Sequence, residues 1–157
     1  MIQKGDQLPT SSLQRLSSEG MQTLSNDDLF KGKKVILFAV PGAFTPTCSE
    51  AHLPGYVVNF DTFKEKGVDD ILCLAVNDAF VMKAWGDSQN AENLLMLADG
   101  DGNFTKALGL NMETGSFGGL RSQRYSMLVE NGVVTILNVE DPKSFEVSTA
   151  EYMLNLL

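Results

Sequence analysis

The chain has few of the residues that build covalent or metal-bound frameworks: two cysteines and one histidine among 157 residues. The two cysteines, Cys48 and Cys73, cannot form a disulfide framework, and with a single histidine they are too few for a zinc site. Free thiols suit a reducing compartment, so we expect a cytoplasmic protein without bound metal. The two cysteines then have either a chemical role or none.

Long apolar runs and positive charge are also lacking. No apolar run approaches the roughly 18 residues that a membrane span requires, and residues 1–12 show no secretory or transit pattern. The 12 basic residues are outnumbered by 20 acidic ones, which gives a net charge of −8 and argues against nucleic acid as a partner. We therefore expect neither membrane nor nucleic acid as a partner. The length fits one globular domain, 1–157.

Apolar runs and turn signals predict the order of the secondary structure. The expected elements are a hairpin that turns at Glu19-Gly20, a helical turn capped by Asn26–Asp28, strands at 35–40, 71–76 and 94–98, helices at 46–66, 79–89 and 104–108, a hairpin of strands 124–129 and 133–139, and a helix opened by a capping box at Ser148–Glu151. Pro54 should kink the helix 46–66 near residue 50. This order predicts an α/β, thioredoxin-like fold: a central mixed β-sheet flanked by helices, with an N-terminal β-hairpin extension.

Cys48 lies at the start of a predicted helix. Thr45 is a good N-cap and Pro46 a good first helical residue, which puts Cys48 in the first turn. The free N–H groups and the positive end of the helix dipole favour a thiolate there. The alternative is that Cys48 is a small, inert residue of the apolar core.

A thiolate alone cannot supply a large rate acceleration. An ordinary cysteine thiol is roughly 3% ionised at pH 7, so complete ionisation gains only about thirtyfold. If the electrophile is a peroxide, the departing oxygen also needs a hydroxyl and a cation nearby. Thr45 offers the hydroxyl one helical turn before Cys48, and Arg121 or Arg124 offers the cation. Alternation along the strand puts Arg124 on one face with Ser126, but a strand arginine is more often a surface charge, so the residues alone leave the cation open.

The segment PGAFTPTCSEAHLPGY, residues 41–56, resembles the active-site segment of the peroxiredoxins, specifically the type-II or type-five subfamily. The shared pattern Pro-x-x-x-Thr-x-x-Cys is met by Pro41, Thr45 and Cys48. Segments 67–85, 94–104 and 124–140 also match, in the same order along the chain. The resemblance implies an antioxidant thiol peroxidase on a thioredoxin-like fold, with no metal, haem or flavin.

The resemblance also implies a role for each matching residue. Cys48 would attack hydrogen peroxide or an alkyl hydroperoxide and become a sulfenic acid. Thr45 would hold the peroxide, Pro41 would shield the sulfur from water, and Arg124 would stabilise the thiolate and the departing oxygen.

The expected peroxide pocket has further members. The backbone N–H groups of Gly42 and Cys48 should bind the peroxide, and Phe44 and Phe117 should line the pocket. His52, one helical turn beyond Cys48, is expected to lie near it, although a lone histidine is more often a packed or solvated residue.

The sulfenic acid must be reduced again by a thiol. The tail, residues 141–157, contains no cysteine, and Cys73 lies within an apolar strand, where we expect it to be buried and inert. This favours a one-cysteine cycle in which an external thiol, glutathione with glutaredoxin or else thioredoxin, reduces Cys48. The resemblance further suggests a homodimer that forms through the face carrying the active-site loop.

Three other hypotheses stay open at this point. The chain could be a redox-sensing or chaperone-like binding protein that uses the same reactive thiol, or a thioredoxin-like module with an inert Cys48. A cysteine hydrolase is a weaker alternative, because no acidic residue is evident that would orient His52 as a base.

Overall fold

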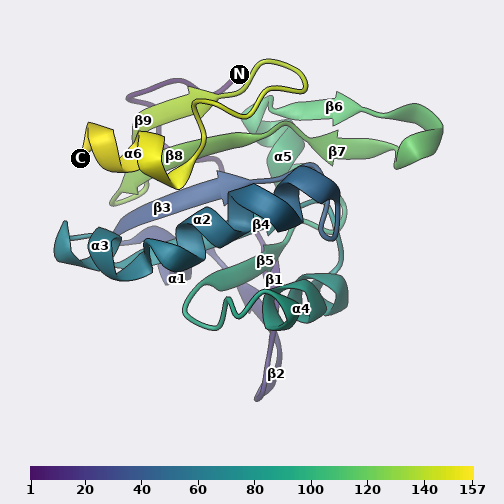
Figure 1. The fold of residues 1–157 in the computed structure, drawn as a ribbon, viewed down its shortest axis with the longest axis horizontal. Helices are drawn as coiled ribbons and strands as arrows, with labels where there is room; N and C mark the ends of the chain where they lie inside the picture. Colours follow the sequence, from purple (N-terminus) through teal and green to yellow (C-terminus); the bar gives the residue numbers. More distant parts are fainter.

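A seven-stranded sheet runs through the centre of the computed structural model, which describes residues 1–157 (Figure 1). Its strands are β1 (Leu13–Ser17), β2 (Gly20–Leu24), β3 (Lys34–Ala39), β4 (Asp70–Ala75), β5 (Leu95–Ala98), β8 (Tyr125–Glu130) and β9 (Val133–Val139). The spatial order is β2-β1-β5-β4-β3-β8-β9. The predicted strands are therefore present, within a residue or two of the predicted bounds.

The sheet is mixed, as predicted. Parallel pairing joins β3 to β4 and β4 to β5, whereas β8 is antiparallel to both β3 and β9. The N-terminal hairpin β1–β2 extends the sheet by antiparallel pairing of β1 with β5. The central strands β3 and β4 are buried over almost their whole length, which explains their continuous apolar sequences.

Helices cover both faces of the sheet. They are α1 (Asn26–Phe30), the π-helical turn η1 (Cys48–His52), α2 (Leu53–Val58), α3 (Phe60–Glu65), α4 (Ala79–Ser88), α5 (Asn103–Leu108), the 3-10 turn η2 (Gly115–Phe117) and α6 (Ala150–Leu156). One apolar cluster packs α2, α3, α4 and α6 against one face, and a second packs α1 and α5 against the other. None of these helices has the length and apolar character needed to cross a membrane.

The predicted helix 46–66 is divided into three parts. At η1 the Leu53 N–H donates to the Cys48 carbonyl, five residues back, so the turn is wider than an α-helical one. The next residue, Pro54, lacks an N–H group, and its ring would crowd the carbonyl four residues earlier, which the wide turn accommodates. The predicted irregularity is therefore a π-helical turn that includes the reactive cysteine. A second break follows at Asn59.

Two of the predicted helix caps are wrong by one residue. Ser25, not Asn26, caps α1, because its hydroxyl accepts from the Asp28 N–H at 3.3 Å. Thr149, not Ser148, caps α6. The Ser148 hydroxyl and N–H group are engaged by an acidic side chain outside the helix, described below.

A short hairpin was not predicted. Strands β6 (Asn111–Glu113) and β7 (Leu120–Ser122) pair with each other and extend from the body of the protein (Figure 1). Each strand has only three residues, too few for a periodic pattern. Arg121 ties this hairpin to the end of β4, since its guanidinium donates to the carbonyls of Gly118 at 3.0 Å and Val76 at 3.1 Å.

Candidate active site

Cys48 is the first residue of η1, directly after the loop that follows β3, and its side chain is fully buried. Helical structure begins at Pro46, and the Thr45 carbonyl accepts from the Ser49 N–H at 2.9 Å, so Thr45 has the predicted position. Its hydroxyl does not cap the helix, however. It donates to the Gly42 carbonyl at 2.7 Å and so closes the loop.

Several backbone N–H groups between β3 and the start of η1 have no partner within the chain, among them those of Gly42 and Cys48. The loop is nevertheless held in place, because the Ala43 N–H donates to the Asn77 side chain at 2.9 Å. Phe44 has a φ of 64°, a value that residues other than glycine seldom adopt. The loop thus presents free N–H groups in a fixed conformation, which suits the binding of an oxygen that carries negative charge.

Arg124 reaches the sulfur from the strand end. The next residue in the chain, Tyr125, pairs with Ala39, the last residue of β3. Arg124 therefore lies at the end of β3 where the active-site loop begins. The guanidinium Nη2 donates to Cys48 Sγ at 3.0 Å, and Nη1 lies 2.8 Å from His52 Nδ1. Of the two arginines considered from sequence, Arg124 is therefore the one in contact with the thiol.

His52 is buried and uses both ring nitrogens. Nε2 lies 3.0 Å from the Ser148 carbonyl, which can only accept, so Nε2 carries the proton and Nδ1 accepts from Arg124. Burial and, secondarily, the charge of Arg124 lower the pKa of His52 from 6.5 to about 3, despite the opposing bond to Ser148. His52 is thus neutral at physiological pH and acts as an acceptor for Arg124.

A cavity of about 520 Å³ opens onto Arg124. The active-site loop contributes Pro41 and Thr47 to its walls, and Met112 of β6 and Phe145 lie on other sides. The volume is far larger than hydrogen peroxide needs, so a larger hydroperoxide or a thiol can approach.

The other predicted pocket residues do not line this cavity. Gly42 and His52 are buried, whereas Phe44 and Phe117 are 57% and 74% exposed. A contact of Phe44 or Phe117 with the peroxide stays a prediction.

The comparisons with known proteins agree with this geometry. The Redoxin family model matches residues 3–154. Peroxiredoxin-2D of Arabidopsis thaliana is 45% identical, with 99% of this chain and 98% of the relative aligned; Peroxiredoxin-2C of Oryza sativa is 47% identical, with 98% and 96% aligned. The crystal structure of reduced Prx3 from Vibrio vulnificus in complex with H2O2 superposes with a TM-score of 0.98, at 66% identity and 99% coverage of both chains.

The chain belongs to the peroxiredoxin family. The resemblance to type-II or type-five members and the thioredoxin-like fold are thereby confirmed. As a peroxiredoxin, it is an antioxidant thiol peroxidase.

The second cysteine of this peroxiredoxin is fully buried in β4. Cys73 pairs with Phe38 on one side and Met96 on the other. Burial raises the pKa of the Cys73 thiol, and the proximity of Cys48 raises it further, against the influence of Arg124. A neutral thiol in the centre of a sheet is a poor nucleophile, as expected from the sequence.

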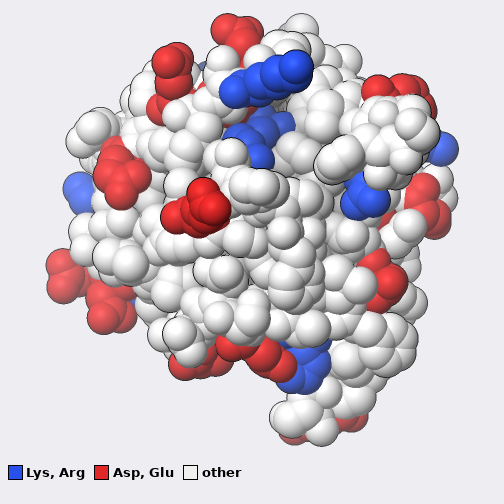
Figure 2. Space-filling view, turned by 45° about the vertical axis from the view of Figure 1, so that its right-hand side comes forward, with Lys and Arg blue, Asp and Glu red and all other residues white.

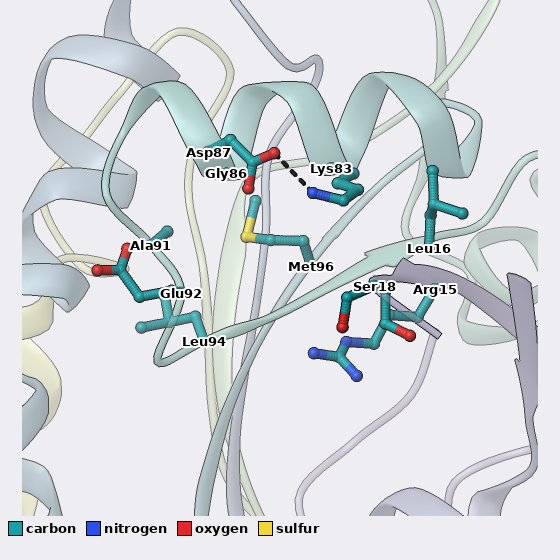
Figure 3. A pocket seen from close by; sticks show the side chains of 11 residues that line it. Arg15, Leu16, Ser18, Lys83, Gly86, Asp87, Ala91, Glu92, Leu94 and Met96 are labelled. Atoms are coloured by element: carbon teal, nitrogen blue, oxygen red, sulfur yellow. Dashed lines mark hydrogen bonds and ion pairs between the residues drawn. The ribbon is translucent and has the colours of Figure 1, made fainter. Parts of the chain in front are cut away.

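A second, smaller cavity of about 170 Å³ lies between α4 and β1. Lys83 and Asp87 form an ion pair of 2.7 Å on its wall, and Met96 also lines it (Figure 3). Neither cysteine of the peroxiredoxin lines it. No group of three or more His, Cys, Asp or Glu side chains is arranged to hold a metal ion.

On the face shown in Figure 2, acidic side chains outnumber basic ones, in agreement with the net charge of −8.

Sequence reasoning missed three residues around the thiol: Glu140, Phe145 and Ser148. The Phe145 ring lies 5.6 Å from the Arg124 guanidinium and 5.1 Å from the His52 ring. The Ser148 carbonyl holds His52, and Glu140 holds Ser148. No sequence signal could have found them, because main-chain atoms make several of these contacts.

Proposed function

We propose that Cys48 is the peroxidatic cysteine of this thiol peroxidase and that Arg124 is the cation that acts on it. The 3.0 Å contact between Arg124 Nη2 and Cys48 Sγ carries this proposal. The thiolate attacks one peroxide oxygen, so that an S–O bond forms and the O–O bond breaks. The departing oxygen takes a proton and leaves as water or an alcohol, and Cys48 becomes a sulfenic acid.

Three loop residues are assigned to the peroxide in this proposal. The unpartnered N–H groups of Gly42 and Cys48 and the hydroxyl oxygen of Thr45 would hold its oxygens, while Pro41 would limit the access of water to the sulfur. His52 was expected beside the substrate. Because both of its nitrogens are engaged, we instead assign it to Arg124.

The proposed reductant is an external thiol. It attacks the sulfenic sulfur of Cys48, and water leaves as a mixed disulfide forms. A second external thiol then attacks this disulfide, so that the Cys48 thiol is released and the two external sulfurs are joined as a disulfide. The burial of Cys73 supports this cycle, since a fully buried thiol with a raised pKa is a poor nucleophile toward the sulfenic acid. Glutathione with glutaredoxin, or thioredoxin, is the proposed donor.

We also propose a homodimer through the face of the active-site loop. Phe44, Phe80 and Phe117 are 57%, 66% and 74% exposed, which is unusual for three phenylalanines. The bond from Ala43 to Asn77 supports placing Phe44 near the start of α4, which carries Phe80. Light scattering should find a dimer for the wild-type chain and a monomer for Phe80→Asp.

The remaining proposals concern domain organisation and location. Two free, buried thiols support a reducing compartment such as the cytoplasm. Two hydrophobic clusters on one shared sheet support a single domain over 1–157. One cooperative unfolding transition would be expected of such a domain.

The deciding experiment is a peroxidase assay with H2O2 and with cumene hydroperoxide, in which glutathione plus glutaredoxin is compared with thioredoxin. Turnover is expected with at least one reductant and is expected to be lost in Cys48→Ser. Sulfenic acid formation without turnover under either reductant would instead favour the redox-sensing or chaperone-like alternative. An unreactive Cys48 would contradict both.

A further inference from the structure

Glu140, at the end of β9, is a buried acid that the scheme above does not use. It is 6% exposed, and no lysine or arginine forms an ion pair with it. Its Oε2 atom accepts from three consecutive N–H groups, those of Glu146 (2.8 Å), Val147 (3.0 Å) and Ser148 (2.8 Å), and from the Ser148 hydroxyl (2.7 Å). A buried carboxylate is costly unless it is hydrogen-bonded, so this arrangement specifies the conformation of residues 146–148.

The fixed segment presents one carbonyl to the active site. The Ser148 carbonyl accepts from His52 Nε2 at 3.0 Å and from the Tyr56 hydroxyl at 2.8 Å. Its position depends on Glu140, because Glu140 binds both the N–H group and the hydroxyl of the same residue. The carbonyl in turn determines that Nε2 of His52 carries the proton.

Glu140 is also bonded to Arg124 directly. Its own N–H group donates to the Arg124 carbonyl at 3.0 Å. The Arg124 backbone is thus held by the Glu140 backbone, and its guanidinium is held by the Glu140 side chain through Ser148 and His52. The contacts form a closed ring in which Nη1 of Arg124 is bonded to His52 and Nη2 is directed at Cys48 Sγ.

We propose that Glu140 is a positioning residue for the reaction at Cys48, acting through the Ser148 carbonyl and His52 to aim the Arg124 guanidinium at the sulfur. The proposal rests on the proposed roles of Cys48 and Arg124. Glu140 touches no reacting atom. Its removal frees the Ser148 carbonyl, and a His52 ring protonated on Nδ1 would then present a hydrogen to Arg124 instead of a lone pair.

The test combines kinetics with the tautomer of a single ring. His52 is the only histidine of the chain, so ¹⁵N-histidine NMR reports it without assignment. Wild-type protein should show the Nε2–H tautomer, and Glu140→Ala should show a substantial Nδ1–H fraction. The rate constant for oxidation of Cys48 by H2O2 should fall by about 10- to 100-fold, the effect of one misdirected charge-assisted hydrogen bond.

Glu146→Gln is the matched control, because it makes the same change of charge in the same segment at an exposed side chain without a hydrogen bond. Its oxidation rate and tautomer should equal those of the wild type. Glu140→Gln keeps one acceptor oxygen and should lose less than Glu140→Ala. If Glu140→Ala does not fold, Glu140→Gln decides the question alone.

Two results would overturn the proposal: folded Glu140 variants with the wild-type oxidation rate, or variants whose rate falls while the His52 tautomer stays as in the wild type. In both cases the oxidation rate of the variant is compared with that of the active wild-type protein. Failure of the function proposed above would appear differently, as an inactive wild type or an active Cys48→Ser.

Discussion

The guanidinium of Arg124 lies 3.0 Å from the sulfur of Cys48, although 76 residues separate them in the chain. The antiparallel pairing of β8 with β3 brings them together, since Arg124 precedes β8 at the point where β3 ends. The same guanidinium donates to His52 Nδ1 at 2.8 Å. One planar guanidinium thus forms hydrogen bonds with a thiol and an imidazole at the same time.

Replacing Arg124 by lysine should therefore be severe even though the charge is kept. An ammonium group is a point charge and cannot donate in two fixed directions as the planar guanidinium does. We expect the second-order rate constant for H2O2 to fall by about 100-fold or more, as for loss of a donor to a developing oxyanion. Stopped-flow single-turnover kinetics would measure it.

Arg15→Lys is a suitable control for that experiment. Arg15 lies in β1 and bonds weakly to Gln22 at 3.4 Å, outside the active-site loop, so its rate should be unchanged. A rate for Arg124→Lys within a few-fold of wild type would refute the assigned role of the guanidinium.

The pKa of His52 predicts a pH dependence of stability. The unfolded chain binds a proton at His52 below pH 6.5, whereas the folded chain does so only near pH 3. Between these values the unfolded state binds more protons, so the free energy of unfolding falls as the pH is lowered, by about 1.4 kcal/mol per pH unit well below 6.5. Above pH 6.5, His52 is neutral in both states, so the free energy of unfolding no longer changes with pH because of this residue.

Urea unfolding of wild type and His52→Gln at pH 7, 6, 5 and 4 tests this expectation. The stability difference between the two proteins should shrink as the pH falls, because only the wild type has the histidine. The carboxyl groups titrate equally in both proteins, so their effects cancel in the difference between the two free energies of unfolding. Parallel pH profiles would contradict the neutral, buried state of His52.

The sequence was sufficient for the sheet and for part of the site. Continuous apolar runs predicted β3 and β4, and alternation correctly placed Arg124 on the Ser126 face of the strand. The helix-start residues Thr45 and Pro46 correctly located Cys48 in a first turn. These features depend on the types of side chain within a short stretch of sequence, which can be recognised without the fold.

The ring of contacts around Arg124 could not be predicted in the same way. Glu140, Asp141 and Glu146 are similar acids within one short segment, yet only Glu140 is buried. Its partners are mainly backbone N–H groups, which every residue except proline has, so the sequence offers no signal for them. The π-helical turn at Cys48 likewise depends on how Pro54 is accommodated in the folded chain.

Cys73 should be dispensable for turnover. Cys73→Ala is preferable to serine, because a hydroxyl between the apolar strands would lack a hydrogen-bond partner. We expect near wild-type peroxidase activity with an external thiol and a loss of stability of about 1 kcal/mol from the small cavity. Abolished turnover in a folded Cys73→Ala protein would show that this buried thiol takes part in the cycle.

Trp85 should report the oxidation state of Cys48. It is the only tryptophan, it is fully buried, and its indole N–H donates at 2.9 Å to the hydroxyl of Ser49, the residue after Cys48. Because Cys48 is itself fully buried, an added oxygen must disturb the turn that holds Ser49, and H2O2 should therefore change the Trp85 emission.

The size of that emission change distinguishes an effect of the Trp85–Ser49 hydrogen bond from an effect of the packing around the indole. Ser49→Ala should reduce it while leaving oxidation of Cys48 intact, and Cys48→Ser should abolish it. Mass spectrometry of the same samples confirms the addition of one oxygen. Constant emission from a wild-type sample that carries the sulfenic acid would mean that the turn around Cys48 accommodates the oxygen without moving Ser49.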